Sequence, residues 1–500
     1  MFSRRRKGVL LHVTSLPGPY GVGDLGPRAR GFARTLGDRG WSVWQVLPLG
    51  PVEGAFGFSP YASPSAFALN PLLVSPEDLR EEGWIDEGEE AAARIAPARP
   101  DRAELERSVR AKNRLLAAAW GRARRDGRFR EDRERFADEA SGWLRDWCRF
   151  VALKERFGGV PWTDWPEALR DRNPEALAAL DRDGSAGERM AFEGFVQFLA
   201  HRQLDRLKGH CAGAGVHLFG DLPIYVAADG ADAWAHRELF QLDASGRPVE
   251  VAGVPPDYFS ETGQRWGNPL FRWDVLEAQG FRWWVDRLRW TLRGLDTVRI
   301  DHFRGFCGYW AIPAGEATAV KGCWRPGPGK AFFDALHAAF GVPPVEDLPP
   351  GVPSPLPLVA EDLGVITEDV IALMHRYRLP GMRVLQFAFG GDGDNPHLPP
   401  NHEPLGVVYT GTHDNNTARG WWTSDATGEE KRALFDYLGR PVGAEEVPRE
   451  LTRLALQSPS RLAVVPLQDL QGLPGSARMN RPASKGGNWA WRARSLEFPG

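Results

Sequence analysis

The sequence predicts an α/β fold, a (β/α)8 TIM barrel with large, partly helical insertions, on three observations. Eight short apolar and β-branched runs are bounded by Gly, Pro or Asp, as strands are. Their apolar residues are nearly continuous instead of alternating, which is typical of parallel strands covered on both faces. Helical segments lie between several of the runs. Eight strands with helical connections favour a closed barrel over an open doubly wound sheet.

The eight runs are spread over the whole chain. They are GVLLHV from Gly8, SVWQVLPL from Ser42, VHLFGDLPIYV from Val216, LDTVRID from Leu295, LPLVAED from Leu356, MRVLQFAF from Met382, GVVYTGTHD from Gly406 and LAVVPLQDL from Leu462. The clearest connecting helix follows the fifth run. Thr367 can cap it, Glu368 and Asp369 suit its positive end, and Pro380 stops it.

Two connections are too long for simple crossovers. We therefore expect one catalytic barrel over residues 1–500, with insertion subdomains at about 50–215 and about 227–290. The first is rich in Ala, Arg, Glu and Leu and reads as largely helical. The second contains PPDYFSETGQRWGNPLF, a loop dense in Pro, Gly and aromatic residues that could cover a substrate. Because little sequence follows the eighth run, we expect no C-terminal β-sandwich.

The composition argues against several kinds of partner. A net charge of −3 over 500 residues gives no electrostatic reason to bind nucleic acid or an anionic membrane, and no segment reaches membrane-spanning length. The four cysteines are scattered without metal-ligand spacing, as in reduced cytoplasmic proteins, and we expect no metal and no cofactor. The 20 tryptophans mostly suit a core, but aromatic rings also stack on sugars. The sequence carries no signal of oligomeric state.

Polar residues gather where the runs end, which in an α/β barrel is the face that carries the chemistry. They are Asp221, Asp301, Glu361, Asp362, His413 and Asp414. Taken singly, each has a structural explanation: Asp301 could pair with Arg299, Asp362 could cap a helix and Asp414 could begin a turn. Together they are harder to explain in this way, because like charges repel unless a site uses them.

Carboxylates at a barrel mouth suggest cleavage of glycosidic bonds, which needs a nucleophile and a proton donor. Arg299 lies two residues before Asp301, so both side chains face the same way on a strand, and a fixed cation favours an ionised nucleophile. Glu361 follows the apolar PLPLVA, and burial there would raise its pKa towards that of a useful acid. Asp414 and His413 could bind sugar hydroxyls and favour an oxocarbenium-like transition state.

The strand ends RID, AEDLG and THDN resemble, in that order, those of the α-amylase superfamily, and longer segments narrow the resemblance to the amylomaltases, a family of 4-α-glucanotransferases. The similar segments run from near residue 8 to near residue 494, which is essentially the whole chain. They are LLHVTSLPGPYGVGDLG, FGFSPYASPSAFALNP, GDLPIYVA, GVPPDYFSETGQRWGNPLF, RIDHFRGF, AEDLG, GTHDNNT and RMNRPASKGGNWAWR.

The resemblance implies a retaining transfer of α-1,4-glucan segments through a covalent glucosyl-enzyme. Asp301 would be the nucleophile, Glu361 the acid and then the base, and Asp414 the transition-state stabiliser. The implied substrate-binding residues are Ser59, Tyr61, Asp221, Tyr258, Phe259, Trp266, Arg299 and His413. The implied partners are maltooligosaccharides, amylose or glycogen-type α-glucans.

Two departures and two alternatives accompany the resemblance. GDLPIYV lacks the Asn-His pair of ordinary α-amylases, which favours the amylomaltases, and Ala483-Ser484 replaces a usual Gly-Thr in a loop. The first alternative is a retaining α-glucan hydrolase that uses the same three carboxylates, since transfer and hydrolysis share the covalent intermediate. The second is a non-catalytic glucan-binding protein, which predicts damage to a catalytic carboxylate, and all three are intact here.

Overall fold

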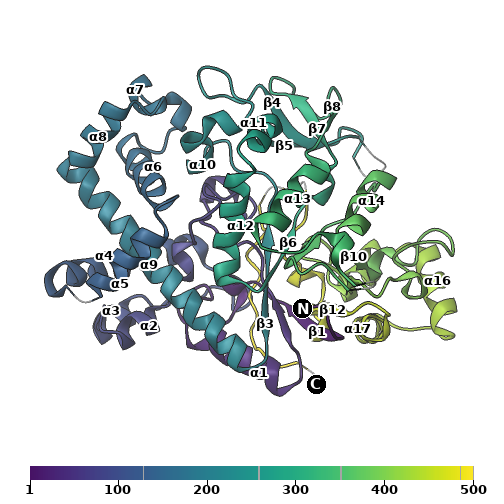
Figure 1. Ribbon diagram of the computed structural model, residues 1–500. Coiled ribbons are helices and arrows are strands. Elements are labelled where there is room, and N and C mark those ends of the chain that lie inside the picture. Colours follow the sequence, from purple (N-terminus) through teal and green to yellow (C-terminus); the bar gives the residue numbers. More distant parts are fainter. Residues whose placement is uncertain (128, 257–259, 350–351, 483, 485, 499–500) are drawn as a thin grey trace.

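A computed structural model describes residues 1–127, 129–256, 260–349, 352–482, 484 and 486–498, and its centre is a parallel barrel (Figure 1). Each of the eight predicted runs overlaps one barrel strand. The strands are β1 Arg6–Leu10, β2 Val43–Gln45, β3 His217–Leu222, β6 Thr297–Ile300, β9 Leu358–Ala360, β10 Gly381–Val384, β11 Gly406–Tyr409 and β12 Leu462–Pro466. The predicted fold class is confirmed.

Chain order and spatial order agree around the barrel. Neighbouring strands pair in parallel in the order β10-β11-β12-β1-β2-β3-β6-β9, so the last strand, β12, lies beside the first. The two ends of this sheet meet where the Ala360 N–H of β9 donates to the Pro380 carbonyl just before β10, at 2.8 Å. All carboxyl ends therefore open on one face of the barrel.

Several strands are shorter than the apolar runs that contain them, for local reasons. β3 ends at Leu222 because Pro223 has no N–H to continue the ladder. β10 ends at Val384, whose N–H donates to His397 Nδ1 at 3.1 Å, and the chain continues as a 3-10 helix over Leu385–Phe387. The polar residues after each strand thus lie in loops at the barrel mouth.

Helices surround the barrel. Those that follow or precede barrel strands are α1 Pro27–Asp38, α12 Arg282–Gly294, α13 Gly329–Ala339, α14 Glu368–Arg376, α15 Ala418–Gly420, α16 Gly428–Leu438, α17 Val447–Gln457 and α18 Leu467–Leu470. Thr367 stands at the N-cap position of α14 as predicted, but its hydroxyl binds the Asp369 carboxylate and not a helix N–H. After β12 the described residues form no further strand of a sheet.

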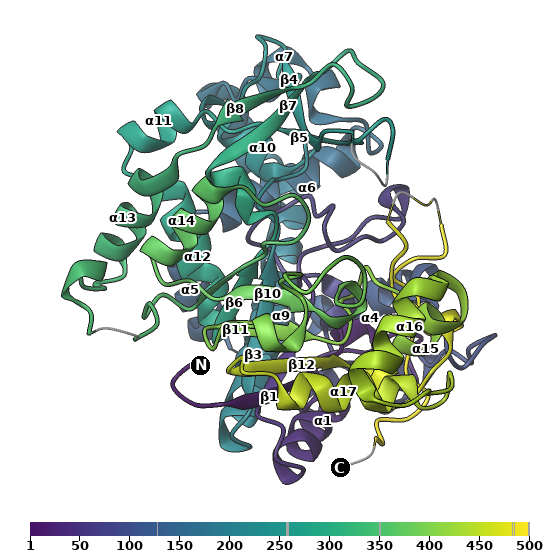
Figure 2. The same ribbon diagram turned by 90° about the vertical axis from the view of Figure 1, so that its right-hand side faces the viewer.

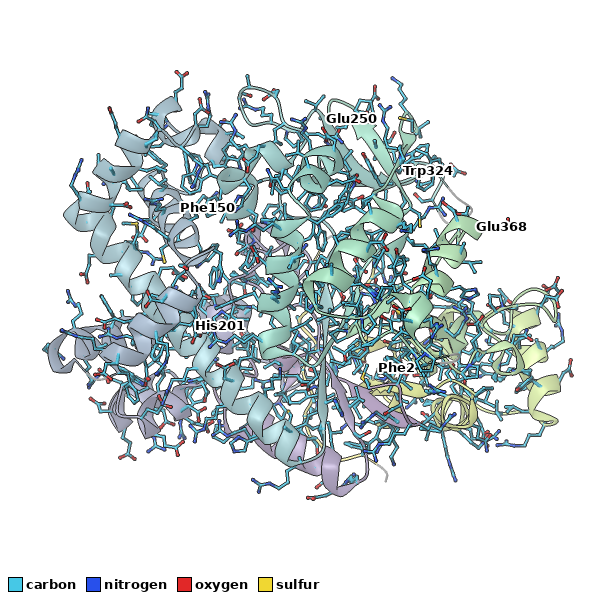
Figure 3. All side chains as sticks on the ribbon, in the orientation of Figure 1. Phe2, Phe150, His201, Glu250, Trp324 and Glu368 are labelled. Carbon is cyan, nitrogen blue, oxygen red and sulfur yellow. The ribbon has the colours of Figure 1, made fainter. Side chains whose placement is uncertain are left out.

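The long connection between β2 and β3 is helical, and Figure 1 shows these blue helices gathered on one side of the barrel. They are α2 Pro76–Glu81, α3 Glu87–Ala92, α4 Leu105–Asp126, α5 Arg130–Glu139, α6 Leu144–Arg156, α7 Glu167–Arg170, α8 Pro174–Arg182 and α9 Gly184–Gly213. The long helix α9 packs against α1 and leads into β3. Figure 3 labels Phe150 and His201 among these helices.

A second, antiparallel sheet lies above the barrel in Figures 1 and 2, and the sequence did not predict it. Its order is β5-β4-β7-β8. The members are β4 Glu250–Val254, β5 Gln264–Pro269, β7 Gly308–Pro313 and β8 Cys323–Pro326, and the helices α10 Ala231–Ala235 and α11 Trp273–Ala278 flank β4 and β5 in sequence. Trp324 of β8 and Glu250 of β4 lie on this upper part of the molecule (Figure 3).

Most of the tryptophans serve the core, as the composition predicts. Five are almost fully buried: Trp44, Trp84, Trp162, Trp234 and Trp284. Trp266 and Trp324 instead keep 38% and 44% of their surface exposed. In the part of the chain that the structure describes, no helix is both long and apolar enough to cross a membrane.

Candidate active site

Arg299 connects two carboxylates at the barrel mouth. Its Nη1 lies 2.8 Å from both oxygens of Asp221 on the neighbouring strand, and its Nη2 lies 2.7 Å from Asp301 Oδ1. The Arg299 and Asp221 side chains are 6% and 0% exposed, whereas that of Asp301 is 31% exposed. One buried guanidinium therefore holds a buried carboxylate on one side and presents an accessible one on the other.

The charges of this cluster support one another. Burial acts to lower the pKa of Arg299, but Asp221 and Asp301 outweigh it and raise that pKa above its usual value. Burial raises the pKa of Asp221, and Arg299 opposes that rise. Arg299 is therefore a permanent cation at the base of the site.

Tyr61 closes the cluster from the loop that follows β2. Its hydroxyl donates to Asp221 Oδ2 at 2.7 Å, and its ring stacks on His413 with centroids 5.1 Å apart and planes 18° apart. Burial, and then the charge of Asp221, raises the pKa of the Tyr61 hydroxyl, which keeps it a donor. Trp489 lies beside both rings, at 5.6 Å from Tyr61 and 6.0 Å from His413.

Glu361 follows β9 and is held by backbone groups. The His302 N–H donates to its Oε2 and the Leu363 N–H to its Oε1, both at 2.8 Å. Burial raises the pKa of Glu361 to about 7, against the lowering effects of Arg299 and of the two N–H groups. A carboxyl group of this kind is protonated for an appreciable fraction of the time near neutral pH, as a general acid must be.

The neighbouring Asp362 has a structural role, but not the helix cap that the sequence suggests. Its carboxylate accepts from the Met382 N–H at 2.6 Å and from Arg383 Nη1 at 2.8 Å. These contacts tie the end of β9 to β10, at the point where the barrel closes.

Asp414 lies in the loop after β11 and its side chain is 46% exposed. Asn480 Nδ2 donates to Asp414 Oδ1 at 2.7 Å, and His413 Nε2 lies 3.4 Å from the same oxygen. Arg478 Nη2 donates to the Asp414 backbone carbonyl at 2.6 Å. Arg478 and Asn480 belong to the RMN segment that supported the resemblance, but sequence reasoning gave neither of them a role.

Buried polar groups fix the Asp414 loop from behind. Asp469 accepts from Thr410 Oγ1 at 2.6 Å and from the Ala418 N–H at 2.7 Å, on either side of the loop. Gln386 Nε2 donates to the Asn416 carbonyl at 2.8 Å. Both residues lie in predicted runs, shortly after β10 and β12, but sequence reasoning gave them no role because neither belongs to a segment that carried the resemblance.

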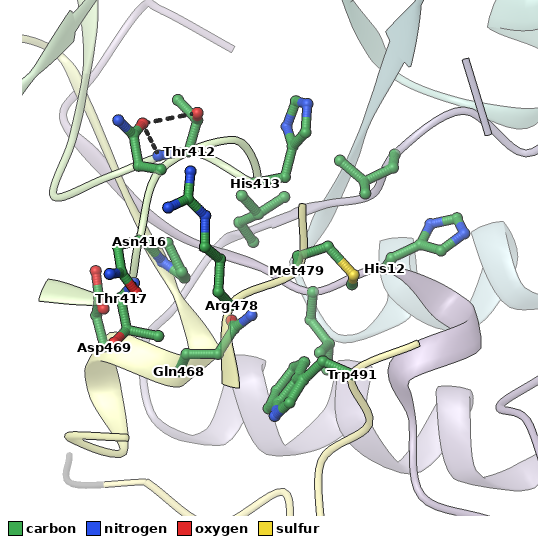
Figure 4. A pocket seen from close by; sticks show the side chains of 15 residues that line it. His12, Thr412, His413, Asn416, Thr417, Gln468, Asp469, Arg478, Met479 and Trp491 are labelled. Atoms are coloured by element: carbon green, nitrogen blue, oxygen red, sulfur yellow. Dashed lines mark hydrogen bonds between the residues drawn. The ribbon is translucent and has the colours of Figure 1, made fainter. Parts of the chain in front are cut away.

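Figure 4 shows side chains that line a small cavity next to this loop. Its volume is about 20 Å³, and His12, Asp469, Arg478, Met479 and Trp491 are among its lining residues. Burial, and then the charge of His413, lowers the pKa of His12 to about 3, so His12 is neutral at ordinary pH. The cavity is too small for a sugar and supports the loop from inside the protein.

The remaining predicted binding residues divide into described and undescribed ones. Ser59 makes a local turn, with its Oγ accepting from the Tyr61 N–H at 3.3 Å. Trp266 of β5 packs edge-on against His302, with ring centroids 4.8 Å apart. Tyr258 and Phe259 lie outside the described residues, as does Ala483. Ser484 is described, and its hydroxyl donates to the Arg481 carbonyl at 2.7 Å.

Taken together, these groups define a class of protein. The mouth of this parallel barrel carries a cation-held aspartate, a partly buried glutamic acid with a near-neutral pKa and a third, accessible carboxylate. This is the equipment of an enzyme that acts on glycosidic bonds. Among the residues that the structure describes, no group of three or more His, Cys, Asp or Glu side chains is placed to hold a metal ion.

Comparison with known proteins identifies the family. The profile of the 4-alpha-glucanotransferase family matches residues 11–497. The chain is 47% identical to a 4-alpha-glucanotransferase of Thermus thermophilus, over 98% of this chain and 94% of that one. It is 44% identical to the chloroplastic/amyloplastic 4-alpha-glucanotransferase of Solanum tuberosum, over 98% and 83%. The chain therefore belongs to the 4-alpha-glucanotransferase family.

A solved structure supports the same conclusion. The amylomaltase of Streptococcus agalactiae, determined in complex with acarbose, superposes with a TM-score of 0.91 at 33% identity and covers 98% of this chain and 95% of that one. The predicted resemblance to the amylomaltases is confirmed. As a member of this family the protein is a transferase that acts on α-1,4-glucans, and the hydrolase alternative is not supported.

Proposed function

We propose that the protein transfers α-1,4-glucan segments by a retaining double displacement, with Asp301 as the nucleophile. The Asp301 side chain is 31% exposed, and Arg299 Nη2 at 2.7 Å from its Oδ1 holds the carboxylate in place. Attack of its carboxylate on the anomeric carbon forms a glucosyl ester, and the leaving glucan departs. The 4-hydroxyl of an acceptor glucan or of glucose then attacks the ester and releases Asp301.

Glu361 serves both steps as acid and then base. With a pKa of about 7 it can protonate the departing oxygen and then accept the proton of the acceptor hydroxyl. Each of its oxygens receives one backbone N–H, which leaves a lone pair on each for the proton in transfer.

Asp414, His413 and Tyr61 are proposed to contact the reacting glucose. In this role the half-exposed Asp414 carboxylate accepts sugar hydroxyl groups and stabilises the positive charge that develops on the ring. Asn480 keeps that carboxylate oriented. Tyr61 and His413 present a stacked pair of rings beside it. Asp221, whose side chain is fully buried, positions the glucose only through Tyr61 and Arg299.

The covering segment between β4 and β5 is proposed to favour a sugar acceptor over water. Water at about 55 M competes for the ester, so transfer needs an acceptor bound in place and water partly excluded. Trp266 at the start of β5 has the exposed ring that such binding uses, and we place Ser59, Tyr258 and Phe259 in the same role from the sequence. We treat residues of about 50–215 and about 227–290 as subdomains that build this cover on the barrel.

Substrates proposed for the enzyme are maltooligosaccharides, amylose and glycogen-type α-glucans. The observation that supports the chemistry best is the division of carboxyl environments, with Arg299 on Asp301 and burial with backbone N–H groups on Glu361. A cytoplasmic location remains a prediction from the sequence.

Maltotriose tests the proposal directly. We expect wild-type enzyme to convert it to glucose plus a ladder of longer oligomers, with the number of reducing ends almost unchanged, because transfer conserves them. Trp266→Ala should raise the share of hydrolysis. A steady rise in reducing ends, with no oligomer longer than the substrate, would refute transfer. Glu361→Gln should still release fluoride from α-glucosyl fluoride in a first-turnover burst, because this leaving group needs no proton, although later turnover lacks the base. Absence of that burst would remove Glu361 from the acid role.

A further inference from the structure

His302, the residue between the proposed nucleophile and the 3-10 helix Phe303–Phe306, has an unusual backbone. Its φ and ψ are both 51°, in the left-handed region that residues with a Cβ rarely adopt. Strained conformations of this kind persist where the surrounding structure enforces them, and they gather at functional sites.

Backbone N–H groups of the left-handed turn donate hydrogen bonds to both the side chain and the backbone of Glu361. β6 and β9 pair in parallel up to Ile300 and Ala360, and the Glu361 N–H continues the ladder to the Ile300 carbonyl at 3.1 Å. At His302 the pattern changes, because its N–H donates to the Glu361 side chain at 2.8 Å and not to a backbone carbonyl. The Phe303 N–H then donates to the Glu361 carbonyl at 3.2 Å.

The ring of His302 is packed where it can hold this turn. It meets Trp266 edge-on at 4.8 Å, with planes 88° apart, and lies 6.5 Å from the ring of Tyr225. A Cβ at Gly305 would lie 3.4 Å from His302 Cδ2 and 2.7 Å from Ile224 Cδ1, so Gly305 leaves room for the ring. His302 Nε2 is buried and has no hydrogen-bond partner among the described residues. Burial lowers the pKa of His302 to about 4, so the ring is neutral and is not the acid or base of the reaction.

We infer, given the acid role proposed for Glu361, that His302 is a positioning residue whose left-handed backbone fixes the spacing between Asp301 and Glu361. Residues 301–303 carry the nucleophile Asp301 and also donate two backbone hydrogen bonds to Glu361. A change in the backbone of this segment therefore moves one carboxylate relative to the other. The packing of Trp266 on the ring extends this clamp to the sheet above the barrel. A displacement of reacting groups by about 1 Å lowers the rate on the order of 10²-fold.

Substitutions at this position separate backbone from ring. His302→Asn and His302→Gly remove the ring but tolerate the left-handed region, whereas His302→Val disfavours it strongly. We expect His302→Val to lose about 10²-fold in transfer from maltotriose and much less on α-glucosyl fluoride, because the acid is misplaced. His302→Asn and His302→Gly should keep most of both activities. If His302→Val does not fold, His302→Ala can be compared with His302→Gly. Both lack the ring, and Ala disfavours the left-handed region less strongly than Val does.

The pH dependence of kcat/KM is a measurement that a general loss of stability would not shift. The His302 N–H stabilises the Glu361 carboxylate, so its loss raises the pKa of Glu361, and the alkaline limb of kcat/KM should move to higher pH in His302→Val. Arg378 offers a matched control, because it is also left-handed, with φ 48°, but follows α14. Arg378→Val should lower Tm as His302→Val does, without changing the ratio of the two donor activities or the pH profile.

Two outcomes would overturn the inference. If His302→Asn and His302→Gly lose as much as His302→Val, the ring and not the backbone carries the effect. If His302→Val loses equally on both donors with an unmoved alkaline limb, His302 does not act through Glu361. Glu361→Gln, measured beside these variants, tests the acid role separately, since its burst of fluoride from α-glucosyl fluoride upholds that role whatever His302 does.

Discussion

Removal of the charge of Arg299 should make the stability of the protein fall as pH rises. In Arg299→Met the Asp221 carboxylate loses its cation but stays buried, with a side chain that is 0% exposed in the wild-type protein. Removal of one partner of a buried ion pair lowers the free energy of unfolding by about 3–5 kcal/mol. Asp301 is accessible to water and adds little to that cost.

The expected change in Tm follows from the size of the chain. The entropy of unfolding is about 2.1 cal/mol/K per residue, which for 500 residues gives about 1 kcal/mol/K. A loss of about 3–5 kcal/mol therefore lowers Tm by about 3–5 °C. Differential scanning calorimetry or fluorimetry at several pH values measures it.

The pH dependence has a definite sign. Burial already raises the pKa of Asp221 and Arg299 opposes that rise, so loss of Arg299 raises the pKa further. A carboxyl whose folded-state pKa is raised stabilises the fold below its unfolded-state pKa, and that stability is lost as pH rises through the folded-state pKa. The deficit of Arg299→Met should thus be small in acid and grow towards neutral and alkaline pH.

Asp221→Asn in the Arg299→Met background is the control, because an amide cannot ionise. The double variant should recover part of the lost Tm at neutral pH and lose the added pH dependence. The reasoning fails if Arg299→Met shows the same deficit at every pH and Asp221→Asn does not relieve it.

Three further predictions concern catalysis. Asp301→Asn should keep the fold, since the replacement is nearly isosteric, yet lose nearly all turnover on maltotriose and on α-glucosyl fluoride, because an amide cannot form the ester; a variant that keeps most activity would make Asp301 a strand end only. Asn480→Ala should lower kcat by about 10- to 100-fold, which corresponds to the energy of one hydrogen bond to a charged group, with a smaller change in KM. An unchanged kcat would mean that Asp414 does not need the hydrogen bond from Asn480. The kcat/KM of the wild-type enzyme should fall on the alkaline side with a pKa of about 7, as Glu361 loses its proton, and Glu361→Gln should lack that limb on α-glucosyl fluoride.

The barrel and the Arg299–Asp301 pair could be predicted because their signals are local. Each barrel strand overlaps a nearly continuous apolar run, and residues two apart on a strand share a face. β8 has no such signal, since all four of its residues are exposed and it pairs only at the edge of the small sheet. β5 contains Gly267 and three exposed residues at its start, so its pattern is that of a loop.

The contacts that complete the site are long-range and could not be predicted from spacing. Tyr61 meets Asp221 across 160 positions, and Asn480 meets Asp414 across 66. Asn480 lies in a segment without a regular helix or strand, where neither helical nor strand periodicity marks its direction. Such a residue becomes identifiable only when the loops at the mouth are placed in space.

The two carboxyl groups that share the proposed chemistry differ in what holds them, and this difference assigns their roles. Asp301 has a guanidinium at hydrogen-bond distance and a side chain that is 31% exposed, so it pairs with a permanent cation and still faces the mouth of the barrel. Glu361 is partly buried and forms no ion pair among the residues that the structure describes, and its carboxyl group accepts from the N–H groups of His302 and Leu363. Groups of one chemical type whose surroundings favour opposite protonation states are the pattern of a nucleophile and its acid partner. The raised pKa of Glu361 suits the acid and leaves the Arg299-bound Asp301 for the nucleophile, which is the assignment that we propose.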